Sequence, residues 1–227
     1  MDKDRQNYYK SKKSELFVQF DGFNNRINDL IAEKYGEENR VKDEIKQEYE
    51  NLYEEMPYIG GDNNSLTTDL VSAVQCLAVY NILKRHKKPL KEIGELCYRA
   101  VDEYLSNNPE LVPPMTDPNV IGFIKYAANE SELRKFSGDW VYNFIDSDEE
   151  NDYGLDFVEC GIYKFFKEHD AEEFTPYMCA MDRIMSKTGN LGLHRTETIA
   201  EGSNRCNFRF KSGRKTMIVN TVIEDDE

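Results

Sequence analysis

The chain has 227 residues, a formal net charge of −14 and 39% hydrophobic residues, with 14 Tyr and 12 Phe. This length and composition predict a folded globular protein with a sizeable core and exclude intrinsic disorder. The acidic excess, with no dense block of Lys and Arg to offset it, disfavours a surface that follows nucleic-acid phosphates. We therefore expect no nucleic-acid partner.

The first 137 residues have the periodicity of α-helices. Apolar residues recur every three or four positions over 16–23 and 41–52, and a strongly apolar face over 66–79 is the best candidate for a buried central helix. A turn rich in Pro and Gly near residues 57–61 separates the second helix from this third one. Two further helices are predicted over 89–104 and 119–136.

The pattern changes at Gly138. Alternating bulky and polar residues predict strands over 139–146, 153–160, 191–200 and 206–211, with short helices over 161–170 and 175–189. The polar residues 201–204 suit a hairpin turn, and residues 217–222 are expected to add an edge strand. The predicted fold class is α+β: a helical region, 1–137, packs with an antiparallel sheet of β-β-α-α-β-β order in 138–227, and both form one integrated domain.

No window approaches the roughly 18 apolar residues of a membrane helix, and residues 1–15 lack the apolar core of a signal peptide. We therefore expect a cytoplasmic protein with no membrane partner. Its five cysteines are an odd number at wide spacing, unlike a disulfide framework, and are expected to be free thiols. They are Cys76, Cys97, Cys160, Cys179 and Cys206.

Three of these cysteines stand at distinctive positions in the second region. Cys160 ends a predicted strand directly before a helix, where backbone N–H groups lower the pKa of a thiol and favour the nucleophilic thiolate. Cys179 and Asp182 are three residues apart on one predicted helix, so they could share a face. Cys206 opens the last strand of the hairpin. Core packing alone would also explain each thiol, because buried free cysteines are common.

A zinc site is the obvious alternative, since thiolates and imidazoles such as His169 and His194 are zinc ligands. However, 18 and 26 residues separate the three cysteines, and neither C-x-x-C nor H-E-x-x-H occurs. We therefore predict no cofactor and no metal. The chain also lacks G-x-x-x-x-G-K-[ST], G-x-G-x-x-G and G-x-S-x-G, which leaves NTPase, Rossmann dehydrogenase and serine hydrolase activities with little support.

Residues 177–210, YMCAMDRIMSKTGNLGLHRTETIAEGSNRCNFRF, resemble the carboxy-terminal signature of the L-2-amino-thiazoline-4-carboxylic acid hydrolase family. That signature pairs a Cys-x-x-Asp helix with an Arg-Thr-x-Thr-(Ile/Leu)-Ala-x-Gly segment and a Cys-x-Phe-x-Phe strand. The matching positions are Cys179, Asp182, Arg195, Thr196, Thr198, Ala200, Gly202, Cys206, Phe208 and Phe210. Cys160 is similar to the family's upstream cysteine, and the resemblance covers about 138–211. One departure is Asn207, where the family commonly has an acidic residue.

The resemblance implies hydrolytic opening of a small cyclic C–N/C–S substrate, as in conversion of an aminothiazoline carboxylate to N-carbamoyl-cysteine. Such a reaction needs a nucleophile at the ring carbon, a proton for the departing heteroatom and a cation for the substrate carboxylate. The implied catalytic residues are Cys160, which attacks or orients water, Asp182, which transfers protons, and Cys206, which completes the pocket or acts as the alternative nucleophile. The implied substrate-binding residues are Arg195, whose guanidinium suits a carboxylate, and Thr196, Cys179 and His194.

The fold is also similar to the small-molecule-binding domain of 4-vinyl reductase type, so a non-enzymatic binding or sensor module is the alternative function. That alternative predicts Cys160 and Cys206 inert to alkylating reagents, whereas a hyper-reactive thiol would favour an enzyme. A pure interaction protein would need an exposed apolar face over 66–80, for which burial is the more economical account. The sequence leaves open the substrate and whether the chain forms a homo-oligomer.

Overall fold

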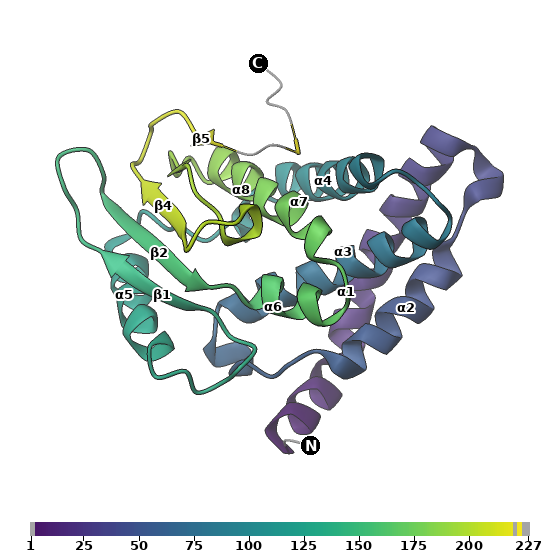
Figure 1. Cartoon of the computed structure of the whole chain (residues 1–227), viewed down its shortest axis with the longest axis horizontal. Coiled ribbons are helices and arrows are strands. Elements are labelled where there is room, and N and C mark those ends of the chain that lie inside the picture. The colour runs from purple at the N-terminus through teal and green to yellow at the C-terminus, as the bar shows by residue number, and fades with distance from the viewer. Residues whose placement is uncertain (1–2, 220–221, 224–227) are drawn as a thin grey trace. The chain divides into compact units, whose positions relative to one another are not determined.

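The computed structural model describes residues 3–219 and 222–223 of the chain. The predicted fold class, α+β, is confirmed: helices precede a five-stranded sheet that lies in the second half (Figure 1). The chain divides into two compact units, Met1–Ala100 and Val101–Glu227. The predicted regions 1–137 and 138–227, and their integration into one domain, stay predictions. Parts of the first predicted helix, residues 1–2, and of the last predicted strand, residues 220–221, lie outside the described residues.

The first unit is built from α1 (Lys3–Tyr35), α2 (Lys42–Glu55), α3 (Leu66–Arg85) and the first part of α4 (Leu90–Asn107). Aromatic residues join α1 to α2: the Phe20 ring stacks on Tyr49 with centroids 3.9 Å apart, and Tyr53 donates to the carbonyl of Tyr9 at 2.6 Å. Buried Asn28 accepts a hydrogen bond from the backbone N–H of Val41 at 3.0 Å. This bond supplies a partner for a donor at the start of α2.

α3 has buried residues all round and is the core helix of the first unit. By length and composition it is long and apolar enough to cross a membrane, and it is the one such helix in the described part of the chain. The expectation that no window would qualify is therefore wrong. The core helix of a folded domain passes the same test, and 67% of the qualifying window is buried inside the protein.

The second unit contains the sheet, in the strand order β1-β2-β4-β3-β5. The strands are β1 (Val141–Ile145), β2 (Tyr153–Glu159), β3 (His194–Arg195), β4 (Cys206–Phe210) and β5 (Met217–Ile218). Neighbouring strands are antiparallel except β3 and β5, which are parallel, so the prediction of a wholly antiparallel sheet is wrong there. β4 runs antiparallel to β3, and the turn after β4 reverses the chain again. β5 therefore runs in the direction of β3, along its free edge.

The register of the sheet separates an aromatic face from a polar face. In β2 and β4, Phe157 is opposite Cys206, Leu155 is opposite Phe208, and Asp156 is opposite Asn207. Because side chains alternate along a strand, the first two pairs lie on one face and the third on the other. The aromatic face is formed by Tyr142, Phe144, Tyr153, Leu155, Phe157, Cys206, Phe208 and Phe210. The polar face carries Asn143, Asp156, Asn207 and Arg209.

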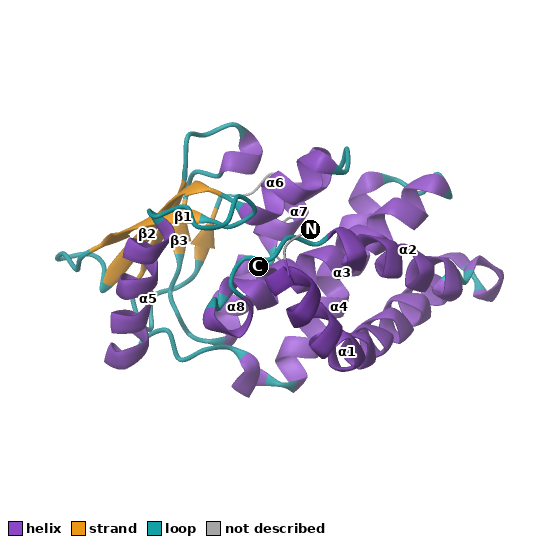
Figure 2. Ribbon diagram, turned by 90° about the horizontal axis from the view of Figure 1, so that it is seen from below, coloured by secondary structure: helices purple, strands orange, loops and turns teal. Residues whose placement is uncertain are grey.

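Short helices surround this sheet: α5 (Pro118–Ser131), α6 (Gly161–Glu168), α7 (Thr175–Ala180) and α8 (Asp182–Thr188). α5 packs against β1 (Figure 2), where the backbone N–H of Tyr142 donates to the hydroxyl of Ser131 at 3.1 Å. α5 ends at Ser131, so residues 132–136 do not extend the helix as predicted.

Two local predictions around β3 are wrong. The helix predicted over 175–189 is broken at Met181, where the backbone bonds of Met181 to Met178 and of Ile184 to Met181 span three residues and tighten the turn. Of the strand predicted over 191–200, β3 keeps two residues. The residues after it, although they alternate in polarity, form a capped turn, because Thr198 Oγ1 accepts a hydrogen bond from the N–H of Glu201 at 3.2 Å.

Candidate functional site

Cys160 lies at the junction of β2 and α6. Its extended backbone (φ −119°, ψ 120°) ends the strand, and its Sγ accepts a hydrogen bond from the N–H of Tyr163 at 3.4 Å. The next residue is a glycine for a steric reason: a Cβ on Gly161 would come within 2.7 Å of the Gly138 carbonyl oxygen and of the Trp140 ring. The first turn of α6 is thereby packed closely, and it holds the thiol of Cys160 in one place, although the residue as a whole is only half-buried.

Burial decides the ionisation of this thiol. Desolvation raises the pKa of Cys160 most, the N–H groups of Tyr163 and Ile162 lower it, and negative charge on Cys206 and Asp182 raises it, with a net pKa of about 12. The helix start does act in the predicted direction, but the desolvation of the thiolate outweighs it. The expectation of a favoured thiolate is therefore wrong for the free protein.

Arg195 in β3 is charged yet only 1% exposed. Its Nη1 donates to the carbonyl oxygen of Cys179 at 3.0 Å and to the carboxylate of Asp182, and its guanidinium carbon is 5.4 Å from the centroid of the Phe208 ring. Its Nε and Nη2 have no hydrogen-bond partner among the described residues. A buried donor without a partner costs free energy, so this edge of the guanidinium is suited to receive ligand oxygens.

Cys179 in α7 and Asp182 at the start of α8 flank the break between these helices. Burial raises the pKa of Asp182, although the charge and hydrogen bond of Arg195 lower it. A third of the Asp182 side chain is accessible, yet its surroundings are dense enough for desolvation to prevail. Burial likewise raises the pKa of Cys179 well above its usual value, against the opposing charge of Arg195.

Cys206, the first residue of β4, is 7% exposed, and its Sγ accepts from the N–H of Ile199 at 3.3 Å. Burial raises its pKa; the Ile199 bond and Arg195 lower it, while Asp182 and Glu201 raise it. Thr198 and Glu201 were not predicted as part of any site. The Thr-x-x-Glu spacing of a capping box was the sequence signal that could have found them.

Five side chains thus come together in the second unit, and we call them the thiol cluster: Cys160, Cys179, Asp182, Arg195 and Cys206. The charge of Asp182 acts on all three thiols, and Cys179 responds to Cys160 and Cys206 as well. They come from the ends and beginnings of elements that are distant along the chain. Within the described ranges, no group of three or more His, Cys, Asp and Glu side chains is arranged to hold a metal ion.

His194 and Thr196 lie away from this cluster. Alternation along β3 directs Arg195 to the aromatic face, and therefore its two neighbours to the polar face, where His194 is paired with Arg209. Thr196 is exposed, and its hydroxyl accepts from the side-chain amide of Asn207 at 2.8 Å. Burial, followed by the charge of Arg214, lowers the pKa of His194. The structure therefore does not bring these two predicted substrate-binding residues to the thiols.

Asn207, where the family pattern commonly has an acidic residue, holds the chain after β3. Its Oδ1 accepts from the backbone N–H of Thr196 at 2.9 Å and of Glu197 at 2.8 Å. Because Asn207 lies on the polar face and Cys206 on the aromatic face, its side chain points away from the thiol. The residue that departs from the family pattern therefore binds backbone N–H groups after β3 and does not face the thiol; we call this pair of bonds the backbone clamp.

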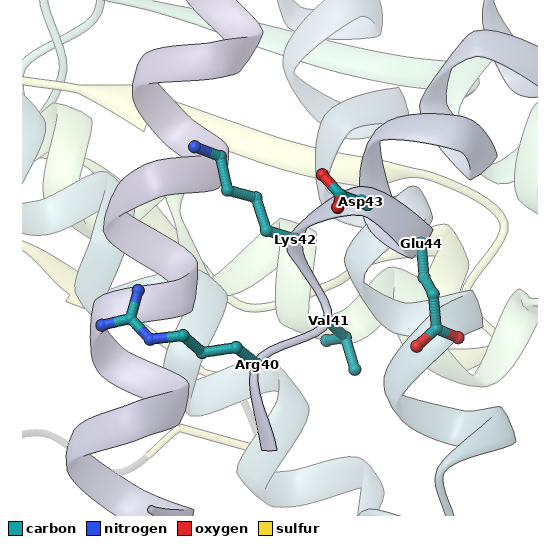
Figure 3. A pocket seen from close by; sticks show the side chains of 5 residues that line it. All are labelled: Arg40, Val41, Lys42, Asp43 and Glu44. Carbon is teal, nitrogen blue, oxygen red and sulfur yellow. The ribbon is translucent and has the colours of Figure 1, made fainter. Parts of the chain in front are cut away.

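A hollow in the first unit has a different character (Figure 3). It is lined by residues 40–44 at the start of α2, and Figure 3 shows the Lys42 and Glu44 side chains pointing in different directions. Arg40 pairs with Glu37 at 2.6 Å and Glu44 with His86 at 3.0 Å. It contains no predicted site residue and no thiol, so it is not the candidate site.

The fold and the cluster define an α+β protein in which thiols, a carboxylate and an arginine meet over the aromatic face of a small sheet. The model of the family described as L-2-amino-thiazoline-4-carboxylic acid hydrolase matches residues 69–210, more than half of the chain. The chain therefore belongs to this family. The match begins in α3, so it reaches further into the helices than the resemblance over 138–211. Neither the curated proteins nor the solved structures compared with the chain give a match.

Proposed function

We propose that the protein is a hydrolase that opens a small cyclic C–N/C–S compound bearing a carboxylate, of the 2-amino-thiazoline-4-carboxylate type. The product is of the N-carbamoyl-cysteine type. One observation carries the proposal: the buried Arg195 has two N–H groups without partners, is hydrogen-bonded to the Asp182 carboxylate, and acts through its charge on the thiols of Cys179 and Cys206. Membership of a family named for this hydrolysis supports the reaction class.

In this proposal Arg195 holds the substrate carboxylate and Cys160 attacks the ring carbon between nitrogen and sulfur. As Sγ bonds to that carbon, Asp182 gives a proton to the ring nitrogen and takes the proton of Cys160. Collapse of the adduct breaks the ring C–S bond, and the departing sulfur takes the proton from the nitrogen. Water then adds to the same carbon and displaces Cys160, returning one proton to Sγ and one to the nitrogen.

The pKa of about 12 for Cys160 affects the first step of the proposed reaction. A thiol that is neutral at physiological pH must lose its proton as it attacks, so a base has to act in the same step. Asp182, whose charge is close enough to shift the pKa of Cys160, is suited to that task. Burial raises the pKa of Asp182, which brings a carboxyl group nearer to the range where it both gives and takes protons.

Turnover of 2-amino-thiazoline-4-carboxylate, followed as loss of substrate and gain of the carbamoyl product, tests the proposal. Replacing Cys160 by Ser should lower kcat by about a hundredfold or more, because the nucleophile is lost. The matched control is Cys97→Ala, which alters a buried thiol of the first unit. Undiminished turnover in the Cys160 variant would remove it from the mechanism, and an inert wild-type protein would refute the proposed reaction.

A second function, a non-enzymatic small-molecule-binding or sensor module of 4-vinyl reductase-like fold, is favoured by one observation. The pKa values of Cys160, Cys179 and Cys206 are all raised by burial, so the resting thiols are poor nucleophiles. This function predicts that a carboxylate ligand binds at Arg195 without being consumed. Binding and product formation measured on the same compound separate the two functions.

A further inference from the structure

The two donors of Arg195 without partners lie on one edge of its guanidinium. In a planar guanidinium the Nε–H and one Nη2–H point in the same direction, spaced like the two oxygens of a carboxylate. Nη1 is already occupied by the Cys179 carbonyl and the Asp182 carboxylate. The aromatic ring of Phe208 lies against the guanidinium, which limits how it can turn. This edge, which has two parallel donors without partners, therefore has the geometry that suits a bidentate oxyanion.

The charges around this edge are already balanced before a ligand arrives. Arg195 is matched by Asp182, and a bound carboxylate would leave the group with one excess negative charge. The groups whose charges interact with Asp182 are Arg195 from β3, Cys160 from the start of α6, Cys179 from α7 and Cys206 from β4. None of the three thiols supplies a second positive charge, and Glu201, whose charge acts on Cys206, is a further carboxylate.

An uncompensated charge in a desolvated site raises the free energy, and protonation of a carboxylate is the change that removes the charge with the smallest rise in free energy. We propose that a carboxylate ligand binds along the Nε–Nη2 edge of Arg195 together with one proton, which Asp182 takes up. This inference rests on the proposed function for the class of ligand, and it adds that binding itself prepares Asp182 as the proton donor. A protonated Asp182 still accepts the Nη1 hydrogen bond through its carbonyl oxygen.

Because ligand binding is coupled to proton uptake, the sign of the pH dependence of ligand affinity is determined. Above the pKa of Asp182 in the free protein, each ligand should bring up to one proton, and affinity should fall by about tenfold per pH unit. Below that pKa Asp182 is already protonated, so affinity should level off. A ligand without a carboxylate adds no negative charge and should bind with no such dependence.

Titration calorimetry with 2-aminothiazole-4-carboxylate, whose aromatic ring resists opening, tests the inference between pH 5.5 and 8.5. Each titration is run in two amine buffers that differ in ionisation enthalpy and contain no oxyanion. The two measured binding enthalpies differ by the number of protons exchanged multiplied by that difference, and 2-aminothiazole-4-carboxamide corrects for protonation of the ring itself. We expect an uptake near one proton for the wild type. Asp182→Asn should bind the carboxylate with almost no uptake and at least as tightly at pH 7.5. Glu197→Gln, on the polar-face side of the chain, should behave as the wild type.

Binding of the probe without proton uptake, an equal uptake in the Asp182→Asn protein, or no preference for the carboxylate over the carboxamide would each overturn the inference. So would a failure to bind the carboxylate at all. A protein that takes up one proton with the probe but never opens a thiazoline ring supports the inference and refutes the proposed hydrolysis. Turnover of the thiazoline without proton-linked binding of the probe would support the proposed hydrolysis and refute the inference.

Discussion

Arg195 and Asp182 are joined by a charge-assisted hydrogen bond that uses only one side of the guanidinium. The bond holds Arg195 in a single orientation, with Nη1 turned to the α7–α8 break and the buried Nε–Nη2 edge left without hydrogen-bond partners. A binding group that is already oriented loses little entropy when a ligand arrives. The pair thus has a donor geometry that suits an anion, as the proposed function requires.

Replacing Arg195 by Lys keeps the positive charge but removes the two parallel donors. We expect kcat/KM for 2-amino-thiazoline-4-carboxylate to fall by about 30-fold, the equivalent of about 2 kcal/mol, because a charged hydrogen bond is lost. Arg205→Gln is the control, since Arg205 pairs with Asp156 and Glu197 beside the polar face. An Arg195→Lys protein with unchanged KM would show that the Nε–Nη2 edge does not bind the substrate.

Cys160 should react slowly with iodoacetamide. With its pKa raised to about 12, its thiolate fraction at pH 8 is about a thousandfold below that of a thiol with the ordinary value of 9.0. Mass spectrometry of labelled peptides should show Cys160 unmodified in the folded protein and modified in urea. Rapid labelling of Cys160 at pH 7.5 in the folded state would contradict the burial argument and point to an activated nucleophile.

The same shift predicts how stability depends on alkaline pH. A folded-state pKa above the unfolded value means that the unfolded chain releases the proton first, so the contribution of Cys160 is intact below about pH 9 and is lost between pH 9 and 12. Buried Tyr53 and Tyr142, whose pKa values burial raises to about 12, act in the same direction above pH 10. Urea unfolding midpoints should therefore fall steadily over this range. A flat profile to pH 11 would contradict the prediction.

Gly161→Ala should destabilise the protein by about 2 kcal/mol, because the added methyl group would overlap the Gly138 carbonyl and the Trp140 ring. Gly122→Ala is the matched control on α5, where a Cβ meets nothing within 4 Å. This second change should stabilise by about 0.5–1 kcal/mol through helix propensity. Urea unfolding measures both, and equal effects would show that the strand-to-helix junction is not packed as described.

Asn207→Asp restores the acidic residue of the family pattern and keeps an oxygen for the N–H groups of Thr196 and Glu197. We expect turnover to stay within about threefold of the wild type, because the side chain lies on the opposite face of the sheet from Cys206. Asn207→Ala should lower the free energy of unfolding by about 1–2 kcal/mol, since the clamp is lost. A large gain in kcat for the Asp variant would instead give that carboxylate a part in the chemistry.

Several elements were predictable because their signals are local. The junction at Cys160 appears in the sequence as a period of two that becomes a period of about four, and β2 and α6 meet there in the structure. The break at Met181 was missed, because the helical periodicity of 175–189 continues through it while the backbone bonding changes. The length of β3 was overestimated for a related reason: residues 191–200 alternate as in a strand, but Thr198 caps a turn through the N–H of Glu201.

By itself the sequence determined the α+β class, the family and the positions along the chain of the residues that form the thiol cluster. These features can be predicted because periodicity and residue spacing within short segments determine the local backbone conformation. Only the tertiary structure decided that β5 runs parallel to β3, that His194 and Thr196 point away from the thiols, and that one edge of Arg195 has no hydrogen-bond partner. It also decided that Cys160 is a neutral thiol, because desolvation depends on which distant segments surround a side chain.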